Sequence, residues 1–100
     1  MIGRLWHGRT TEGNADPYQS LLKAEVLPGI RIEGYRGAYV LRRDAGDGVE
    51  FATLTLWDSL DAVREFAGDD YERAVVLPEA RRLLTAFDER SGHYEIVLEP

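Results

Sequence analysis

GYRGAYVLRRDAGDGVEFATLTLWDS, residues 34–59, is the stretch that decides the fold of this chain. Its two halves are rich in β-branched and aromatic residues, which favour a pleated, packed surface. Between them lies Asp44–Gly48, DAGDG, in which Asp can bond its own backbone and Gly can adopt a positive φ. The stretch therefore predicts two strands joined by a tight turn.

The second strand of this hairpin is apolar on both of its faces. Alternate positions give two sets: Phe51, Thr53, Thr55 and Trp57 on one face, and Ala52, Leu54 and Leu56 on the other. A hairpin with one solvated face would alternate apolar and polar residues instead. Helices can cover one face, but a chain of 100 residues has few elements left for the other. We therefore expect a homodimer in which a second subunit covers it.

The segments around the hairpin carry strand and helix patterns in a regular order. Ile2–Arg9 is expected as the first strand, and Asp16–Leu27 as the first helix, with Asp16 as N-cap and Pro17 as the first helical residue. The expected elements after the hairpin are a helix at Ser59–Ala67 ending at Gly68, a short helix from Asp69 to about Val76, a further turn or two after Pro78, and a last strand at His93–Leu98. The order β-α-β-β-α-(α)-β predicts a ferredoxin-like split βαβ sandwich of the α+β class.

Composition narrows the range of functions. One hundred residues are expected to form a single domain, residues 1–100. The net charge of −6 disfavours nucleic acid and anionic membranes as partners, and suits a soluble protein that handles neutral or weakly charged small molecules. The expected partner is a small hydrophobic molecule. The absence of cysteine excludes disulfides, thiol catalysis and cysteine-bound metal centres. No signal peptide or membrane span is recognisable, so a cytoplasmic location is expected.

Three segments of the chain resemble the antibiotic biosynthesis monooxygenase family: RGAYVLRRD (Arg36–Asp44), LTLWDSLDAVREFAG (Leu54–Gly68) and HYEIV (His93–Val97). The resemblance extends over nearly the whole chain and implies a dimeric α+β barrel, in which two sheets pack face to face. It also implies a monooxygenase-like enzyme acting on an aromatic, polyketide-like or quinol-like molecule. Some members of the family oxidise anthrones or quinols with O₂ and need no metal or organic cofactor, so none is expected here.

Related branches leave alternatives open. Some dimeric barrels are cyclases or isomerases, which would not require O₂, and others are ligand-binding or stress-related proteins without a known activity. One branch degrades haem and has a Trp late in the second helix and a haem-ligating His ten residues later. Those positions hold Phe66 and Val76 in this chain, and the first-strand Asn of that branch falls at or near His7. The resemblance therefore argues against haem degradation by that mechanism.

His7 and His93 are the candidate catalytic bases, since a histidine with a pKa near neutrality can take a proton from a phenol or a carbon acid. In a ferredoxin-like sheet the first and last strands are antiparallel neighbours, so both histidines are expected at the same end. The register decides whether they share a face. Each can equally be a strand-end residue with a structural hydrogen bond. A metal site with Glu50 or Glu95 is not predicted, because no ligand spacing supports it.

Five aromatic side chains are candidates for the walls of a ligand pocket between sheet and helices: Trp6, Phe51, Trp57, Phe66 and Tyr71. Aromatic residues also dominate ordinary cores, and for Trp57 and Phe66 a core position is the stronger expectation. Tyr71 differs from these because a buried hydroxyl needs a hydrogen-bond partner.

Overall fold

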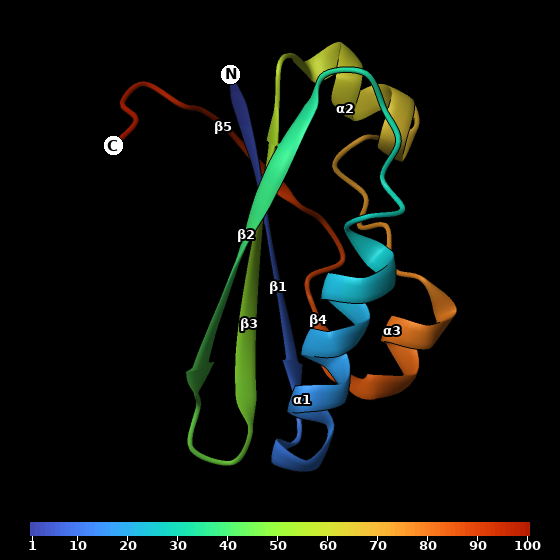
Figure 1. Ribbon diagram of the computed structural model, residues 1–100, viewed down its shortest axis with the longest axis vertical. Coiled ribbons are helices and arrows are strands. Elements are labelled where there is room, and N and C mark those ends of the chain that lie inside the picture. The colour runs from blue at the N-terminus through green and yellow to red at the C-terminus, as the bar shows by residue number, and fades with distance from the viewer.

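One antiparallel sheet with helices on one side makes up the computed structural model, which describes residues 1–100 (Figure 1). The strands are β1 (Ile2–Thr10), β2 (Tyr35–Asp44), β3 (Val49–Trp57), β4 (Leu84–Phe87) and β5 (Gly92–Glu95). The helices are α1 (Glu12–Leu21), which continues as the π-helical segment η1 (Leu22–Val26), then α2 (Leu60–Ala67) and α3 (Pro78–Leu83). This arrangement confirms the ferredoxin-like α+β prediction. None of the helices combines the length and the apolar character that crossing a lipid bilayer requires.

The β2–β3 hairpin has the position that the sequence predicts. Its strands pair from Tyr35 opposite Trp57 to Asp44 opposite Val49. In the turn, the backbone N–H of Ala45 donates to the carbonyl oxygen of Gly48 at 2.9 Å. The φ of Gly46 is 81°, a value that glycine adopts without strain. Turn chemistry and strand propensity therefore agree along the whole hairpin.

β1 and β3 are the central strands of the sheet, whose order is β2-β3-β1-β4, with β5 also paired to β1. β4 pairs with the end of β1 and β5 with its beginning, so the edge beside β1 is shared by two short strands. The sequence predicts one last strand at His93–Leu98, and this is wrong in two ways: β4 precedes it, and β5 ends at Glu95. Between β4 and β5 the chain leaves the sheet, because its backbone pairs with residues 72–74 instead of with β1. There the carbonyl oxygen of Glu89 accepts from the backbone N–H of Ala74, and the backbone N–H of Ser91 donates to the carbonyl oxygen of Glu72.

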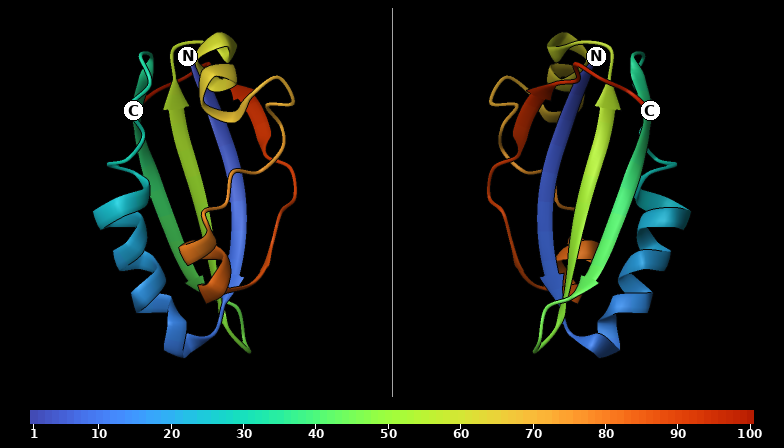
Figure 2. Two further views of the ribbon diagram at one scale, coloured as in Figure 1. Left: turned by 90° about the vertical axis from the view of Figure 1, so that its right-hand side faces the viewer. Right: turned by 90° about the vertical axis from the view of Figure 1, so that its left-hand side faces the viewer.

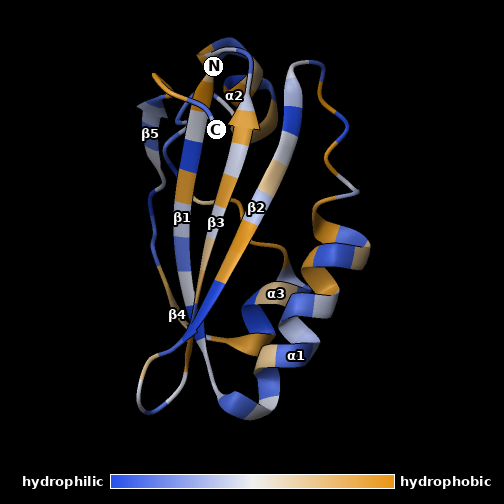
Figure 3. Ribbon diagram, turned by 60° about the vertical axis from the view of Figure 1, so that its left-hand side comes forward, coloured by the Kyte–Doolittle hydropathy of each residue, from blue (hydrophilic) through white to orange (hydrophobic).

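The strands present one face to the helices and one open face to solvent. On the helix face, Phe51 and Trp57 are fully buried. On the open face, Tyr39, Leu41 and Tyr94 are each more than half exposed. The right-hand view of Figure 2 looks onto the open face, with α2 and α3 behind the sheet and α1 beyond its β2 edge, and Figure 3 shows apolar stretches along the strands. The predicted arrangement, helices on one face and none on the other, is therefore found.

Two clusters form the core between the helix face and the helices. In the first, the ring of Tyr18 packs edge-on against Phe51, with ring centroids 4.9 Å apart. In the second, Trp57 lies between Tyr35 and Phe66, at centroid distances of 5.1 and 5.3 Å. The first cluster packs against α1 and α3, and the second against α2.

α1 begins four residues before the predicted N-cap, Asp16. Thr11 caps it instead, and its hydroxyl accepts a hydrogen bond from the backbone N–H of Asn14 at 3.2 Å. Pro17 therefore lies inside the helix. Asp16 and Gln19 do not form the predicted capping box, because both accept hydrogen bonds from Arg42 of β2, at 2.7 and 2.9 Å.

The helix predicted for residues 69–76 is not formed. The carbonyl oxygens of Tyr71 and Arg73, which a helix would use internally, accept hydrogen bonds from Arg4 of β1. α2, by contrast, has the predicted limits: Ser59 caps its start by accepting from the backbone N–H of Ala62, and Gly68 ends it with a φ of 90°. Local capping explains α2, whereas a tertiary contact explains the irregular segment.

Candidate functional site

An apolar cavity of about 80 Å³ lies between the helix face of the sheet and the helices. Most of its wall is hydrophobic and includes Trp6, Leu22, Val26, Phe66, Val76 and Leu77. Its polar side chains are Arg4, Tyr18, Thr53, Thr55 and Ser91. Part of η1 belongs to the wall, and π-helical turns often occur at functional sites. An apolar cavity with a few polar groups is the usual form of a small-molecule site.

Arg4 is the charged residue of this cavity. It lies on the central strand β1 and is only 5% exposed. Its Nη1 donates to the carbonyl oxygen of Tyr71, and its Nη2 donates to that of Arg73 at 3.1 Å. Burial lowers the pKa of Arg4 to about 10, so the guanidinium stays charged at neutral pH. No carboxylate forms an ion pair with it. The cavity therefore contains a desolvated cation, which is costly without an anion beside it.

His93 lies opposite Arg4 across the β1–β5 pair and on the same face. Its Nε2 is 3.0 Å from Nη1 of Arg4. A guanidinium can only donate, so we assign Nε2 as the acceptor and place the ring proton on Nδ1. Nδ1 is buried and has no hydrogen-bond partner. Burial, and then the charge of Arg4, lower the pKa of His93. The ring is therefore held neutral and has a proton, rather than a lone pair, to offer at Nδ1.

His7 lies on the open face, on the other side of the sheet from His93. It is paired with Ala52 of β3 and is not part of the cavity wall. Its Nδ1 is 2.9 Å from a carboxylate oxygen of Asp88, which also accepts from the backbone N–H of His7 at 3.1 Å. The structure thus puts the two histidines on neighbouring strands but does not bring them together in one site.

The five aromatic candidates have three different placements. Trp6 and Phe66 line the cavity, and the indole N–H of Trp6 donates to the carbonyl oxygen of Asp88 at 2.7 Å. Phe51 and Trp57 lie within the two core clusters. Tyr71 lies beside the cavity rather than in its wall: its ring is 5.0 Å from that of His93, measured between centroids.

Arg4 and Thr53 are two polar residues of the cavity wall that the sequence reasoning does not identify as candidates. Thr53 lies opposite Trp6 across the β1–β3 pair, and its hydroxyl oxygen is buried with no hydrogen-bond partner. A signal for Arg4 exists in the strand pattern, because Ile2, Arg4 and Trp6 alternate onto one face. An arginine between two large apolar residues of one strand face indicates a buried cation, provided that face is known to be the covered one.

The residues around the cavity do not fit haem. Haem iron is bound by His, Cys, Met or Tyr, and the cavity wall contains no His, Cys or Met. Tyr18 is the single tyrosine of the wall, and burial raises its pKa to about 12, which opposes the phenolate that iron ligation needs. Val76 lies in the wall where a haem-ligating histidine is expected from the family resemblance. Elsewhere in the chain, no three or more His, Asp or Glu side chains are grouped to hold a metal ion.

The fold and cavity together define a small ferredoxin-like α+β protein with an apolar cavity under its helices. A Bacillus cereus protein assigned provisionally as an antibiotic biosynthesis monooxygenase has the same fold, with a TM-score of 0.65 and 14% identity over 99% of this chain and 95% of that one. The heme-degrader MhuD from Mycobacterium tuberculosis, with two hemes bound in its active site, has a TM-score of 0.64 and 17% identity over 100% of this chain and 99% of that one. A provisionally assigned antibiotic biosynthesis monooxygenase from Chloroflexus aurantiacus has a TM-score of 0.58 and 21% identity over 99% of this chain and 95% of that one.

These similarities extend over nearly the full length of each chain. No sequence-family model matches this chain, and no curated protein is similar to it in sequence. The resemblance expected from the sequence is therefore confirmed through the fold: this is the fold of the antibiotic biosynthesis monooxygenase family.

Proposed function

We propose that this protein is a monooxygenase-like enzyme that binds a small aromatic molecule between its sheet and helices and oxidises it with O₂, without a bound cofactor. The observation that carries the proposal is the apolar cavity with two polar features, the buried guanidinium of Arg4 and the unpartnered hydroxyl of Thr53. Together they suit an aromatic ring that bears an oxygen substituent. The fold comparison supports the reaction class by analogy.

The chemistry requires an electron-rich substrate. Loss of a proton from a phenol or an activated methylene gives an anion that can react with O₂. For a methylene the balance is R–CH₂–R′ + O₂ → R–CO–R′ + H₂O, so one oxygen atom enters the product, the other becomes water, and no reductant is consumed. Arg4 would stabilise the negative charge that develops on the substrate. Of the two histidines, His93 is the nearer to this site, and it would act on the reaction by positioning Arg4, because its Nε2 lone pair already accepts from that guanidinium.

The size of the cavity restricts the substrate. A volume of about 80 Å³ is smaller than the roughly 150 Å³ of a cavity known to bind benzene. A second hollow of about 520 Å³ lies between the α1–η1 segment and β2. Leu22 and Leu27 belong to the walls of both spaces, so displacement of their side chains would join the two. We expect substrates of one or two rings to be accepted more readily than three-ring anthrones.

Oxygen uptake tests the proposed activity. EDTA-treated protein would be mixed with dihydroxynaphthalenes and anthrones, and its O₂ consumption compared with the spontaneous rate. We expect uptake above that rate for dihydroxynaphthalenes, reduced in His93→Ala and retained in His7→Ala, because His7 lies on the other face of the sheet. Uptake that His7→Ala abolishes would put the chemistry on the open face. Turnover that does not need O₂ would support a cyclase or isomerase.

A second candidate, ligand binding without catalysis, is favoured by the small volume of the cavity and by the absence of both histidines from its wall. In this case a dihydroxynaphthalene would quench the fluorescence of Trp6 without O₂ uptake. The same experiment therefore separates the two functions.

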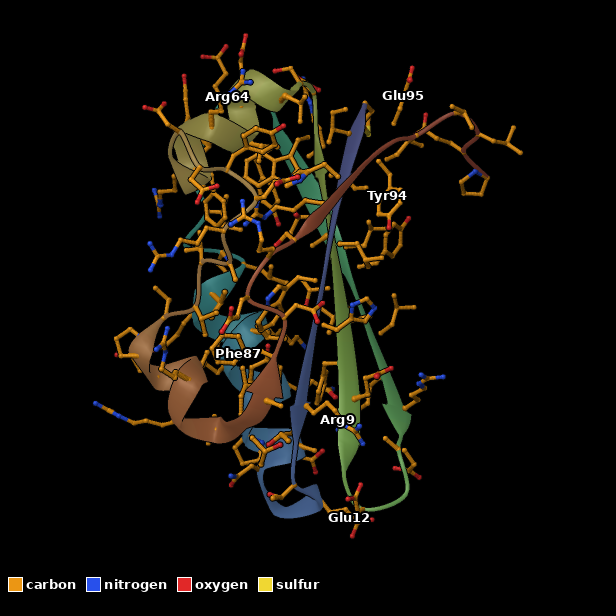
Figure 4. All side chains as sticks on the ribbon, turned by 180° about the vertical axis from the view of Figure 1, so that it is seen from behind. Arg9, Glu12, Arg64, Phe87, Tyr94 and Glu95 are labelled. Carbon is orange, nitrogen blue, oxygen red and sulfur yellow. The ribbon has the colours of Figure 1, made fainter.

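We further infer that the open face is the interface of a homodimer. Tyr39, Leu41 and Tyr94 are 59%, 54% and 58% exposed, and exposed apolar patches of this kind mark interaction surfaces. Figure 4 shows Tyr94 on the side of the sheet away from the helices. The C-terminal residues Val97 and Leu98 are also apolar and exposed, and Figure 1 shows the C-terminus on that side. A second copy that presents the same face would cover both the sheet and this segment.

A further inference from the structure

Arg4 has more hydrogen-bond donors than the surrounding protein uses. A guanidinium carries five N–H groups. Nη1 contacts the carbonyl oxygen of Tyr71 and Nε2 of His93, and Nη2 donates to the carbonyl oxygen of Arg73 at 3.1 Å. These contacts occupy three of the five groups. Nε–H and one N–H of Nη2 remain without a protein acceptor, on a side chain that lines the cavity.

The charge of Arg4 is also left uncompensated. The acceptors around it are neutral: two backbone carbonyls and a histidine that cannot be protonated at Nε2 while Arg4 donates to it. The nearby carboxylate of Glu72, whose charge acts to raise the pKa of His93, forms an ion pair with Arg90 at 3.2 Å and not with Arg4. On the remaining side lies the ring of Phe66, with its centroid 5.8 Å from Cζ of Arg4. A buried cation in such surroundings is stabilised by an anion that enters the site.

Thr53 supplies an independent observation in the same cavity. Its hydroxyl oxygen is buried without a partner, although a hydroxyl can both donate and accept a hydrogen bond. Buried polar groups in native structures are normally paired with protein, water or ligand. A hydrocarbon in this cavity would leave Thr53 and the free donors of Arg4 unpaired, whereas a ring with an anionic oxygen could pair with both.

The geometry points to an oxyanion subsite: the cavity selects its aromatic ligand in ionised form, as a phenolate or enolate, with the oxygen bound by Arg4 and Thr53. This inference rests on the proposed function of the cavity as an aromatic site and specifies the substrate class. It makes Arg4 and Thr53 the residues that determine specificity. His93 has a positioning role, because its Nε2 holds the Nη1 side of the guanidinium and leaves Nε free.

The test uses the wild-type protein and two probes of similar size, 4-nitrophenol and nitrobenzene. 4-Nitrophenol ionises near neutral pH and its phenolate is yellow, so absorbance reports the ionisation state of the bound probe. We expect the phenolate to bind at least tenfold more tightly than nitrobenzene and than neutral 4-nitrophenol. The second of these two ratios corresponds to a pKa of bound 4-nitrophenol lowered by about one unit or more. Benzoate serves as a third probe, to separate a single oxyanion from a carboxylate.

Four variants assign the effect to residues. Arg4→Met and Thr53→Val should each reduce the preference for phenolate while nitrobenzene binding is retained. Arg4→Lys should keep part of the preference, since it keeps the charge but loses the directed N–H groups. Arg64→Met is the matched control, because Arg64 is a cation over the ring of Tyr71 but not in the cavity wall. If Arg4→Met fails to fold, the Thr53→Val variant and the comparison of phenolate with nitrobenzene in the wild type still test the oxyanion subsite.

Each remaining outcome contradicts a stated part of the inference. Equal affinities of the wild type for phenolate and nitrobenzene would overturn the oxyanion subsite and leave the aromatic cavity in place. An Arg64→Met variant as impaired as Arg4→Met would show a general electrostatic effect and overturn the assignment to Arg4. Tighter binding of benzoate than of phenolate would overturn the phenolate class. Failure of all three probes to bind would overturn both this inference and the proposed function.

Discussion

At the scale of single residues, His93 links the stability of the fold to pH. Burial and the charge of Arg4 lower the pKa of His93 from its usual 6.5, so the unfolded chain takes up a proton at a higher pH than the folded one. The contribution of neutral His93 to the free energy of unfolding is therefore fully present above about pH 6.5, and it is lost as the pH decreases through the lowered pKa of the folded state. Urea unfolding from about pH 8 to about pH 5 should show this loss, and His93→Gln should flatten it.

The control for this prediction is His7→Gln, which removes the other histidine from an exposed pair with Asp88. Exposed ion pairs contribute little to stability, so this variant should keep the pH dependence of the wild type. An unchanged pH dependence in His93→Gln would contradict the neutral, Arg4-bound state of His93. The carboxyl groups whose pKa values are lowered by arginine partners, Asp58 and Asp70, titrate below this range and do not interfere.

At the scale of secondary-structure elements, the end of the β2–β3 hairpin depends on Gly48. A Cβ at this position would lie 2.6 Å from the backbone carbonyl oxygen of Thr10, at the end of β1. Gly48→Ala must therefore push the hairpin away from β1, and we expect the free energy of unfolding to fall by about 1–3 kcal/mol. Gly13 in α1 has no atoms within 4 Å of such a Cβ, so Gly13→Ala should instead stabilise by roughly 0.5 kcal/mol. Equal midpoints for Gly48→Ala and the wild type in urea unfolding would contradict the close approach.

The elements that can be predicted from the sequence are those with local determinants. The hairpin follows from its turn residues, and α2 from Ser59 and Gly68, which cap it in the structure. Where prediction fails, a distant side chain decides the outcome. Arg42 takes up the two residues expected to cap α1, and Arg4 binds the carbonyls of the segment expected to be helical.

The candidate site shows the same division. Trp6 and Phe66 can be proposed from residue type, since aromatic residues are typical of both cores and pockets. Arg4 and Thr53 cannot, because their roles depend on the strand register and on which face the helices cover. The register also decides that His7 and His93 lie on opposite faces, which their positions in the sequence leave open.

At the scale of the whole molecule, one sheet serves two purposes on its two faces. Thr53 of β3 reaches the cavity, whereas its neighbours Ala52 and Leu54 lie on the open face. If the open face is a dimer interface, Leu41→Glu should convert a dimer into a monomer, since it would bury an unpaired charge against the second copy. Light scattering at several concentrations measures this. Ser20→Glu, the same charge change at an exposed position of α1, should remain dimeric.

The placement of the cavity adds a second expectation for the Leu41→Glu monomer. All groups that we assign to the ligand, namely Arg4, Thr53 and the aromatic wall, come from one chain and lie on the helix face. A folded monomer should therefore bind 4-nitrophenolate with an affinity close to that of the dimer. Loss of binding together with loss of the dimer would show that the second subunit completes the site, and a wild-type monomer at every concentration would remove the role we assign to the open face.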